Sequence, residues 1–239
     1  MIPVVLIATD RRLEITTRNV RSLINQTVKP IIVIVCSNQN EVKHYNSLGC
    51  KTTFWANNPL GAKWQHGVNF AKSFNPDILI ITGSDDILSE TFVEQSIGLI
   101  NQGNDFIGIR AYWQHRDKKA FYCKYTASNN MPLGGGRVYS SNFLKWADYK
   151  IFDTSKKTRL DDLGWDRIRK SGFKYTVLEN PEKHGMEIHA IKGNWAMLNP
   201  FTIKHKNIEL VKVEPASKVL PFFYANEYPS EVANSFGNV

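Results

Sequence analysis

The sequence predicts an α/β fold in which a mixed, mostly parallel central sheet is flanked by helices. Apolar runs of four or five residues recur through the first half of the chain, and amphipathic segments separate them. The runs are apolar on both faces, which is typical of parallel strands covered by helices on both sides. From residue 106 onward the apolar pattern changes, so we expect the second half to be mixed.

The first half is expected to contain four strands, over residues 4–8, 31–35, 52–55 and 78–82. Helices are expected over residues 13–26 and 62–74, because apolar side chains recur on one helical face of each segment. A further helix should follow Ser89, a favourable N-cap residue, and end at Gly103.

The second half is expected to contain shorter elements. Strands are expected over residues 106–110, 120–125 and 174–178, and helices over 141–146 and 161–171. A polar loop over residues 114–119 should join the first two strands. Residues 215–239 contain three prolines around an aromatic group, so this segment is interpreted as an extended tail.

Composition excludes several classes of protein. The chain has 239 residues, of which 42% are hydrophobic and 22% charged, so global disorder is excluded. A membrane-spanning helix needs about 20 apolar residues, and the longest runs are far shorter; the N-terminal residues lack the pattern of a signal peptide. Three cysteines without a C-x-x-C pair indicate neither disulfides nor a cysteine zinc site. We expect a cytoplasmic protein and leave a peripheral membrane location open.

The net charge of +8 favours an anionic partner, such as nucleic acid, a membrane surface or a phosphorylated small molecule. Basic clusters occur at Lys156–Lys157 and over residues 167–170. They are separated in sequence and lack the aromatic side chains on which single-stranded nucleic acid stacks. No nucleic-acid partner is therefore expected.

Two adjacent carboxylates follow the most apolar strand. Residues 78–82 lead directly into Gly83, Ser84, Asp85 and Asp86. Ligands bind at the carboxyl ends of strands in open parallel sheets, and Mg²⁺ or Mn²⁺ takes carboxylate oxygens together with substrate phosphates. The alternative is that this segment only caps the following helix.

This arrangement resembles family 2 glycosyltransferases, which have the GT-A (Rossmann-like) fold, over residues 2–174. Residues 26–35 are similar to the family's Q-T-x-x-P-x-x-I-x-V string, with Val33 at the position of its Ile, and an N-x-x-G-x-x-x-x-x-G segment begins at Asn58. The carboxylate pair matches the end of the family's Asp-x-Asp-Asp motif. The sequence departs from the family at residues 37–38, where an Asp pair is usual, and at Gly83, where the first Asp of that motif belongs.

The resemblance implies a hexosyltransferase-type glycosyltransferase of glycan biosynthesis that depends on a nucleotide sugar. It implies one GT-A domain over residues 1–214, with a donor half over 1–105 and an acceptor half over 106–214. The donor would be a UDP-, GDP- or dTDP-linked sugar, the acceptor a glycan, glycolipid or glycoprotein, and the cofactor Mn²⁺ or Mg²⁺. A homodimer is left open.

The resemblance also implies roles for individual residues. The residues expected to bind the donor are Thr9, Asp10, Arg11, Ser37, Asn38, Asn58, Gly61, Lys63, Ser84 and Asp85. The expected metal ligands are Asp85, Asp86 and His189, with His184 a weaker candidate. The expected acceptor-side residues are Gly135, Gly136, Arg137 and Trp195, and Arg137 could meet a diphosphate.

The resemblance places the general base at Asp161 or Asp162. Counting back from Arg167 and Gly172 along the family pattern selects Asp161, whereas matching the acidic pair selects Asp162. A base is needed because an acceptor hydroxyl is a poor nucleophile until its proton is removed. One carboxylate on the acceptor side implies a single displacement with inversion at the anomeric carbon.

Three other functions are weighed against this one. A sugar nucleotidyltransferase is disfavoured, because residues 8–12 lack glycine. A non-catalytic GT-A-like module that binds sugar stays open, because Gly83 interrupts the family motif. A basic nucleic-acid-binding protein is the remaining alternative, and it would bind DNA without binding nucleotide sugars.

Overall fold

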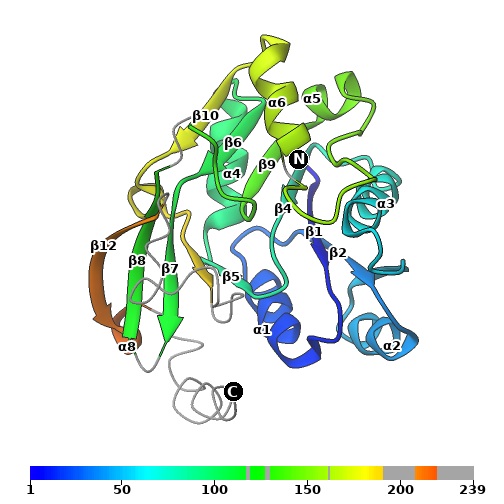
Figure 1. Cartoon of the computed structure of the whole chain (residues 1–239), viewed down its shortest axis with the longest axis horizontal. Coiled ribbons are helices and arrows are strands. Elements are labelled where there is room, and N and C mark those ends of the chain that lie inside the picture. Colours follow the sequence, from blue (N-terminus) through cyan, green and yellow to red (C-terminus); the bar gives the residue numbers. More distant parts are fainter. Residues whose placement is uncertain (117–118, 127–129, 161, 191–207, 220–239) are drawn as a thin grey trace.

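Seven strands form the central sheet, in the order β10-β6-β9-β4-β1-β2-β3 (Figure 1). The computed structural model describes residues 1–116, 119–126, 130–160, 162–190 and 208–219. All strand pairs of the sheet are parallel except those of β9, which runs antiparallel to β4 and β6. The predicted α/β class is confirmed. The strands are β1 (Pro3–Ala8), β2 (Ile31–Cys36), β3 (Lys51–Phe54), β4 (Ile78–Ile81), β6 (Phe106–Ile109), β9 (Arg137–Ser140) and β10 (Tyr175–Leu178).

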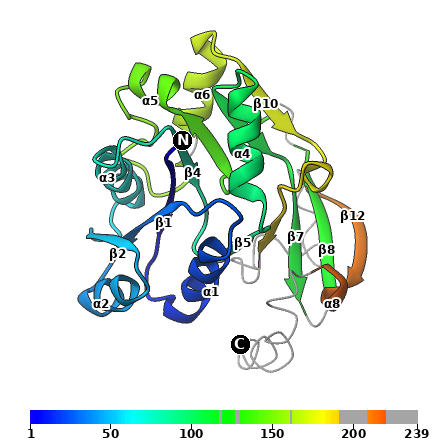
Figure 2. The ribbon, with the colours of Figure 1, turned by 180° about the vertical axis from the view of Figure 1, so that it is seen from behind.

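Helices cover both faces of this sheet, as Figures 1 and 2 show from opposite sides. Val5 and Ile7 of β1 face one hydrophobic cluster, and Val4 and Leu6 face the other. This alternation explains why the strands are apolar at every position. The first cluster packs against α1 (Leu13–Ile24), α2 (Gln39–Ser47) and α4 (Phe92–Asn101). The second packs against α3 (Leu60–Lys72), α5 (Ser141–Trp146) and α6 (Asp162–Ser171).

Helix α3 lies very close to the sheet. A Cβ atom at Gly67 would lie 2.6 Å from Val35 Cγ2 and 2.7 Å from Leu6 Cδ1, so only glycine allows this approach. One turn earlier, the same helix carries Lys63, whose side chain reaches the carboxyl ends of β1 and β2. The close packing of α3 therefore positions a lysine at the edge where ligands bind in such folds.

A second sheet continues from the first, in the order β12-β8-β7-β11-β5. Strand β5 follows β4 after a turn at residues 82–85, so the turn that carries the predicted carboxylates joins the two sheets. The strands are β5 (Asp86–Leu88), β7 (Ala111–Arg116), β8 (Lys119–Tyr125), β11 (Ile188–Ala190) and β12 (Ile208–Pro215).

Several local expectations need correction. The predicted polar loop over residues 114–119 is largely strand, and α2 and β5 were not predicted. Ser89 does not cap α4, because its hydroxyl donates to the carbonyl of Gly185 at 2.7 Å and the helix begins at Phe92. The predicted tail opens with a short helix, α8 (Ala216–Val219), and residues 220–239 lie outside the described part.

Within the described ranges, no helix combines the length and apolar character that crossing a bilayer requires.

Candidate functional site

The carboxyl ends of β1, β2 and β4 meet at one edge of the central sheet. Backbone hydrogen bonds extend the pairing just beyond the strands, from Thr9 N–H to the Val35 carbonyl and from Thr82 N–H to the Leu6 carbonyl. The loops that follow these strands are therefore neighbours. They bring together most of the residues predicted to bind the donor, namely Thr9, Asp10, Arg11, Ser37, Asn38, Ser84 and Asp85.

Lys63 and Glu41 connect the loop after β1 with the loop after β2. The Lys63 side chain is completely buried, and its ammonium donates to the Thr9 carbonyl and, at 2.5 Å, to Ser37 Oγ. The Glu41 carboxylate accepts the N–H groups of Arg11 at 2.6 Å and Ser37 at 2.7 Å. Lys63 was predicted to bind the donor directly. Its contacts instead hold the two loops that are predicted to bind the donor.

Glu41 was missed in the sequence, although a signal for it exists. Asn38 caps α2 by accepting the Glu41 N–H at 2.9 Å, and Asn-x-x-Glu is a variant of the capping box. The motif predicts the start of a helix. What it does not predict is that the Glu41 side chain crosses to the β1 loop, because that contact depends on the pairing of β1 with β2.

Beneath the two loops, the positive charge of Lys63 lies near the negative charges of Glu41 and Asp10. Burial lowers the pKa of Lys63, while the carboxylates of Glu41 and Asp10 oppose that shift. Burial acts to raise the pKa of Asp10, but hydrogen bonding and charge from Arg11 outweigh it and lower that pKa. The Asp10 carboxylate also accepts a hydrogen bond from Asn57 Nδ2 at 3.3 Å. Asp10 therefore stays ionised at the site.

Asp86 fills the space that two glycines leave open. Its Oδ2 atom accepts the Gly83 N–H at 2.8 Å, and a Cβ atom at either Gly83 or Gly135 would lie 2.6 Å from that oxygen. The departure at Gly83 from the family motif now has a physical reason. A side chain at position 83 would require the carboxylate of Asp86 to move.

Asp85 lies beside Asp86 and faces Arg12. Arg12 Nη1 is 3.4 Å from Asp85 Oδ2. Burial raises the pKa of Asp85, although the Arg12 charge opposes the shift. Burial and the charge of Asp85 raise the pKa of Asp86 to about 7. The Arg12 guanidinium therefore offsets the charge of Asp85, while burial favours the protonated form of Asp86.

The donor set at this turn fits a hard divalent cation. Asp85 Oδ1 and Asp86 Oδ2 both approach the position that a Cβ atom of Gly83 would fill, at 3.2 and 2.6 Å. Carboxylate oxygens are the ligands that Mg²⁺ or Mn²⁺ prefers. Among the described residues, no three His, Cys, Asp or Glu side chains group as a metal site.

His189, a predicted metal ligand, lies away from the carboxylate pair. The register pairs Ala190 with Asp86 and His189 with Ile87, so His189 and Asp86 point to opposite faces of the second sheet. His189 is completely buried, and its Nδ1 is 3.0 Å from His115 Nε2. His184, the weaker candidate, is exposed at the end of η1 (Pro181–His184).

The glycine segment contributes differently from the prediction. Arg137, expected to face the acceptor or a diphosphate, is 1% exposed, and it donates to the carbonyls of Leu133 at 2.6 Å and Pro132 at 2.8 Å. It therefore holds the preceding loop. Gly136 has a positive φ and packs against Ile188, whereas Gly135 lies at Asp86 and so borders the carboxylate pair.

Two further residues predicted to bind the donor, Gly61 and Asn58, lie at and just before the start of α3. At Gly61 the space of a side chain is filled by the Asp153 carbonyl, so this glycine serves close packing of the 153–156 loop on α3. Asn58 is exposed and precedes a cis peptide bond to Pro59.

Asp162, one of the two candidate bases, is the first residue of α6. Its carboxylate lies 2.7 Å from Arg159 Nη2, and 17% of its side chain is exposed. Asp161, the other candidate, lies outside the described residues, as does Trp195. The structure therefore gives the setting of one candidate only.

No family model and no curated protein matches the sequence. Solved structures of S. aureus TarS do match the fold. The structure of TarS residues 1–349 superposes with a TM-score of 0.61 at 18% identity, over 80% of this chain and 60% of that one. A longer TarS structure gives the same score and identity over 36% of its length. The complex of TarS 1–349 with UDP gives 0.58 at 17% identity, over 75% of this chain and 58% of that one.

These matches identify the fold as GT-A. The chain spans about 60% of the length of TarS 1–349.

Proposed function

We propose that this protein is a glycosyltransferase that moves a sugar from a nucleoside-diphosphate sugar to an acceptor hydroxyl. The observation that carries the proposal is the carboxylate pair Asp85–Asp86, which lies at the carboxyl end of β4 beside the loops of β1 and β2. In a parallel sheet this is the edge where nucleotides bind. The presence of UDP in a solved structure with the same fold supports the proposal.

The loops after β1 and β2 would bind the nucleoside. Asp10 offers a carboxylate that is held as an anion, and Lys63 and Glu41 fix the backbone of both loops from below. Such a preformed site lowers the ordering cost of binding. The donor would be a UDP-, GDP- or dTDP-linked sugar, with UDP first because of the complex above.

The diphosphate would lie between Arg12 and the carboxylate pair. Asp85 and Asp86 would hold Mn²⁺ or Mg²⁺, which supplies positive charge against the charge that builds on the departing diphosphate. Arg12 is half exposed and already lies at Asp85, so its guanidinium is placed to meet a phosphate oxygen.

The proposed reaction is a single displacement. The acceptor oxygen forms a bond to the anomeric carbon as the bond from that carbon to the diphosphate oxygen breaks, and the configuration inverts. The hydroxyl proton passes to a carboxylate, for which Asp162 is the candidate with a described setting. Its carboxylate lies 2.7 Å from Arg159 Nη2, which fixes its position at the start of α6. The acceptor would be a glycan, glycolipid or glycoprotein.

Calorimetric titration of UDP, GDP, CDP and dTDP, with and without Mn²⁺, tests the proposal. Wild-type protein should bind one of these nucleotides, more tightly with the metal. Asp85→Ala should weaken that binding by at least about tenfold, because a charged hydrogen-bonding or coordinating group contributes roughly 1.5–3 kcal/mol.

Asp148→Ala is the matched control, since Asp148 is an exposed aspartate paired with Lys150 outside the site. It should leave nucleotide binding unchanged. If wild-type protein binds none of the four nucleotides under either condition, the proposed function is wrong. If Asp85→Ala binds as tightly as wild type, the site is misplaced.

A further inference from the structure

Two buried polar groups on one face of the second sheet have no hydrogen-bond partner within the described part of the chain. They are the hydroxyl of Tyr112 and the amide nitrogen of Gln114, both on β7. Tyr112 is 6% exposed and Gln114 1% exposed. An unsatisfied buried donor costs about 1–3 kcal/mol, so both groups are expected to serve something that binds there.

The sheet register connects these groups to the carboxylate pair. Gln114 of β7 pairs with Ala190 of β11, and Ala190 pairs with Asp86 of β5. Paired residues share a face, so the three side chains form one row across three strands, and Tyr112 shares that face two residues away. Adjacent strands lie about 4.8 Å apart, which places Asp86 and Gln114 roughly 10 Å from each other.

The residue in the middle of this row, Ala190, has only a methyl group as its side chain. Ala190 separates an acceptor, the Asp86 carboxylate, from a donor, the Gln114 amide. The row begins at Asp86, which is partly exposed, and ends at Gln114, which is buried. It therefore extends inward from the carboxylate pair at which the donor diphosphate is proposed to lie.

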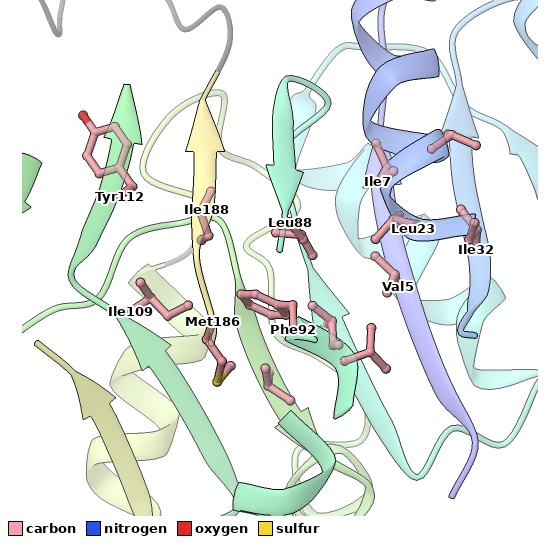
Figure 3. Close-up of a cluster of buried hydrophobic side chains, with 14 of the residues drawn as sticks. Val5, Ile7, Leu23, Ile32, Leu88, Phe92, Ile109, Tyr112, Met186 and Ile188 are labelled. Atoms are coloured by element: carbon pink, nitrogen blue, oxygen red, sulfur yellow. The ribbon is translucent and has the colours of Figure 1, made fainter. Parts of the chain in front are cut away.

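The surroundings of the row are apolar. Tyr112, Phe121, Cys123 and Ile188 belong to one hydrophobic cluster, and in Figure 3 the Tyr112 hydroxyl points away from the aliphatic side chains around Leu88 and Phe92. Burial and the charges of Cys123 and Asp86 raise the pKa of Tyr112. The hydroxyl is therefore a neutral donor whose protonation is influenced by Asp86. Few polar groups among apolar side chains are a feature that small-molecule sites share.

We propose that Asp86, Tyr112 and Gln114 form the subsite for the sugar ring of the donor. The inference rests on the proposed function and names residues that would determine which sugar is accepted. A hydroxyl donor and an amide donor on one side of Ala190, and a carboxylate acceptor on the other, match the several hydroxyl groups of one sugar ring.

The test measures nucleotide and nucleotide-sugar affinity separately. For the nucleotide identified by the panel above, calorimetry compares the diphosphate with its glucose, galactose and N-acetylglucosamine conjugates. The variants are Tyr112→Phe, Gln114→Leu and their combination. Because neither group has a partner in the described chain, the variants should fold with unchanged or higher stability.

The expected result is selective. Each variant should weaken the preferred conjugate by up to about tenfold, the value of one hydrogen bond, and the combination by more. The affinity for the diphosphate alone should not change. Tyr122→Phe is the control, because the Tyr122 hydroxyl is also buried without a partner in the described chain but lies on the opposite face, against Trp113.

Three other outcomes would each overturn the proposed subsite. If the combined variant binds every conjugate as wild type does, the subsite is refuted while the proposed function stands. Equal weakening of diphosphate and conjugates also refutes it, because the damage is then to the whole site. If wild-type protein binds neither diphosphate nor conjugate, the proposed function fails first and the subsite with it.

Discussion

At the scale of single residues, the departure of Gly83 from the Asp-x-Asp-Asp motif can be related to its contacts with neighbouring atoms. The carboxylate of Asp86 accepts the Gly83 N–H and occupies the place of a side chain at position 83. The glycine thus leaves room for the Asp86 carboxylate beside the backbone of this turn. We therefore expect that an aspartate placed here would not act as an added ligand.

Gly83→Asp is therefore expected to weaken metal-dependent nucleotide binding, although it restores the Asp-x-Asp-Asp motif in the sequence. The new Cβ would lie 2.6 Å from Asp86 Oδ2, and a third buried carboxylate would add repulsion. We expect a destabilisation of roughly 1–3 kcal/mol, as for overpacking, and a loss of nucleotide affinity. Chemical unfolding and calorimetry measure the two effects.

Gly98→Asp is the control for this substitution. Gly98 is exposed on α4 and has no atom within 4 Å of an added Cβ, so the same change should cost little there. Tighter nucleotide binding by Gly83→Asp than by wild type would show that position 83 does accept a ligand side chain.

At the scale of secondary-structure elements, the second sheet holds a buried histidine pair between β7 and β11. His115 and His189 are completely buried and hydrogen-bonded to each other at 3.0 Å. Burial, together with the neighbouring ring, lowers the pKa of His115 well below 6.5, and burial lowers the pKa of His189 to about 3. Both rings are therefore neutral in the folded protein.

This pair should make the protein less stable as the pH falls. The folded-state pKa values lie below the unfolded value of about 6.5, so the unfolded chain takes up protons first. The contribution is complete above about pH 6.5 and is lost as the pH falls toward 3. Between pH 6.5 and 5 the expected loss from His189 is roughly 2 kcal/mol, and His115 adds to it in the same direction, measurable by urea unfolding.

Comparison with the double variant His115→Leu, His189→Leu isolates this effect. Replacing both partners of a buried hydrogen bond by apolar groups is nearly neutral, and the variant keeps every carboxylate. Burial raises the pKa values of Asp85, Asp86 and Glu187, which act in the opposite direction. If wild type and variant lose stability equally between pH 6.5 and 5, the histidines are not the cause.

At the scale of the whole molecule, the net charge of +8 includes the two basic clusters noted in the sequence. In the described part of the chain these clusters are partly neutralised by neighbours: Lys156 lies 3.8 Å from Asp153, and Arg169 lies 2.6 Å from Asp166. Arg167 donates to the Ala147 carbonyl. We therefore expect these clusters to attract anions only weakly.

Binding of a single-stranded oligonucleotide should accordingly be weak and lost with salt. Phosphate contacts made by dispersed cations release counterions, so the affinity should fall by about tenfold or more between about 50 and 200 mM salt. Nucleotide binding at the buried loops should persist over that range. Oligonucleotide binding that survives the higher salt and excludes nucleotide would favour the nucleic-acid alternative.

The sequence by itself determined the α/β class, most elements of the first half and the position of the carboxylate pair. Strands such as β1 and β4 are apolar at every residue, which requires helices on both sides, and the turn after β4 follows from its composition. The extent of α5 was also predicted as observed. These features depend on local patterns, which a sequence displays directly.

Only the tertiary structure decided where the polar side chains point. Lys63 and Glu41 are directed to backbone groups of the loop after β1, far away in the chain, and His189 is separated from Asp86 by the sheet register. The unpartnered Tyr112 and Gln114 emerge only from the pairing of β7 with β11. The physical reason is that a polar side chain takes the partners that strand pairing and helix packing bring to it, and those partners are distant in sequence.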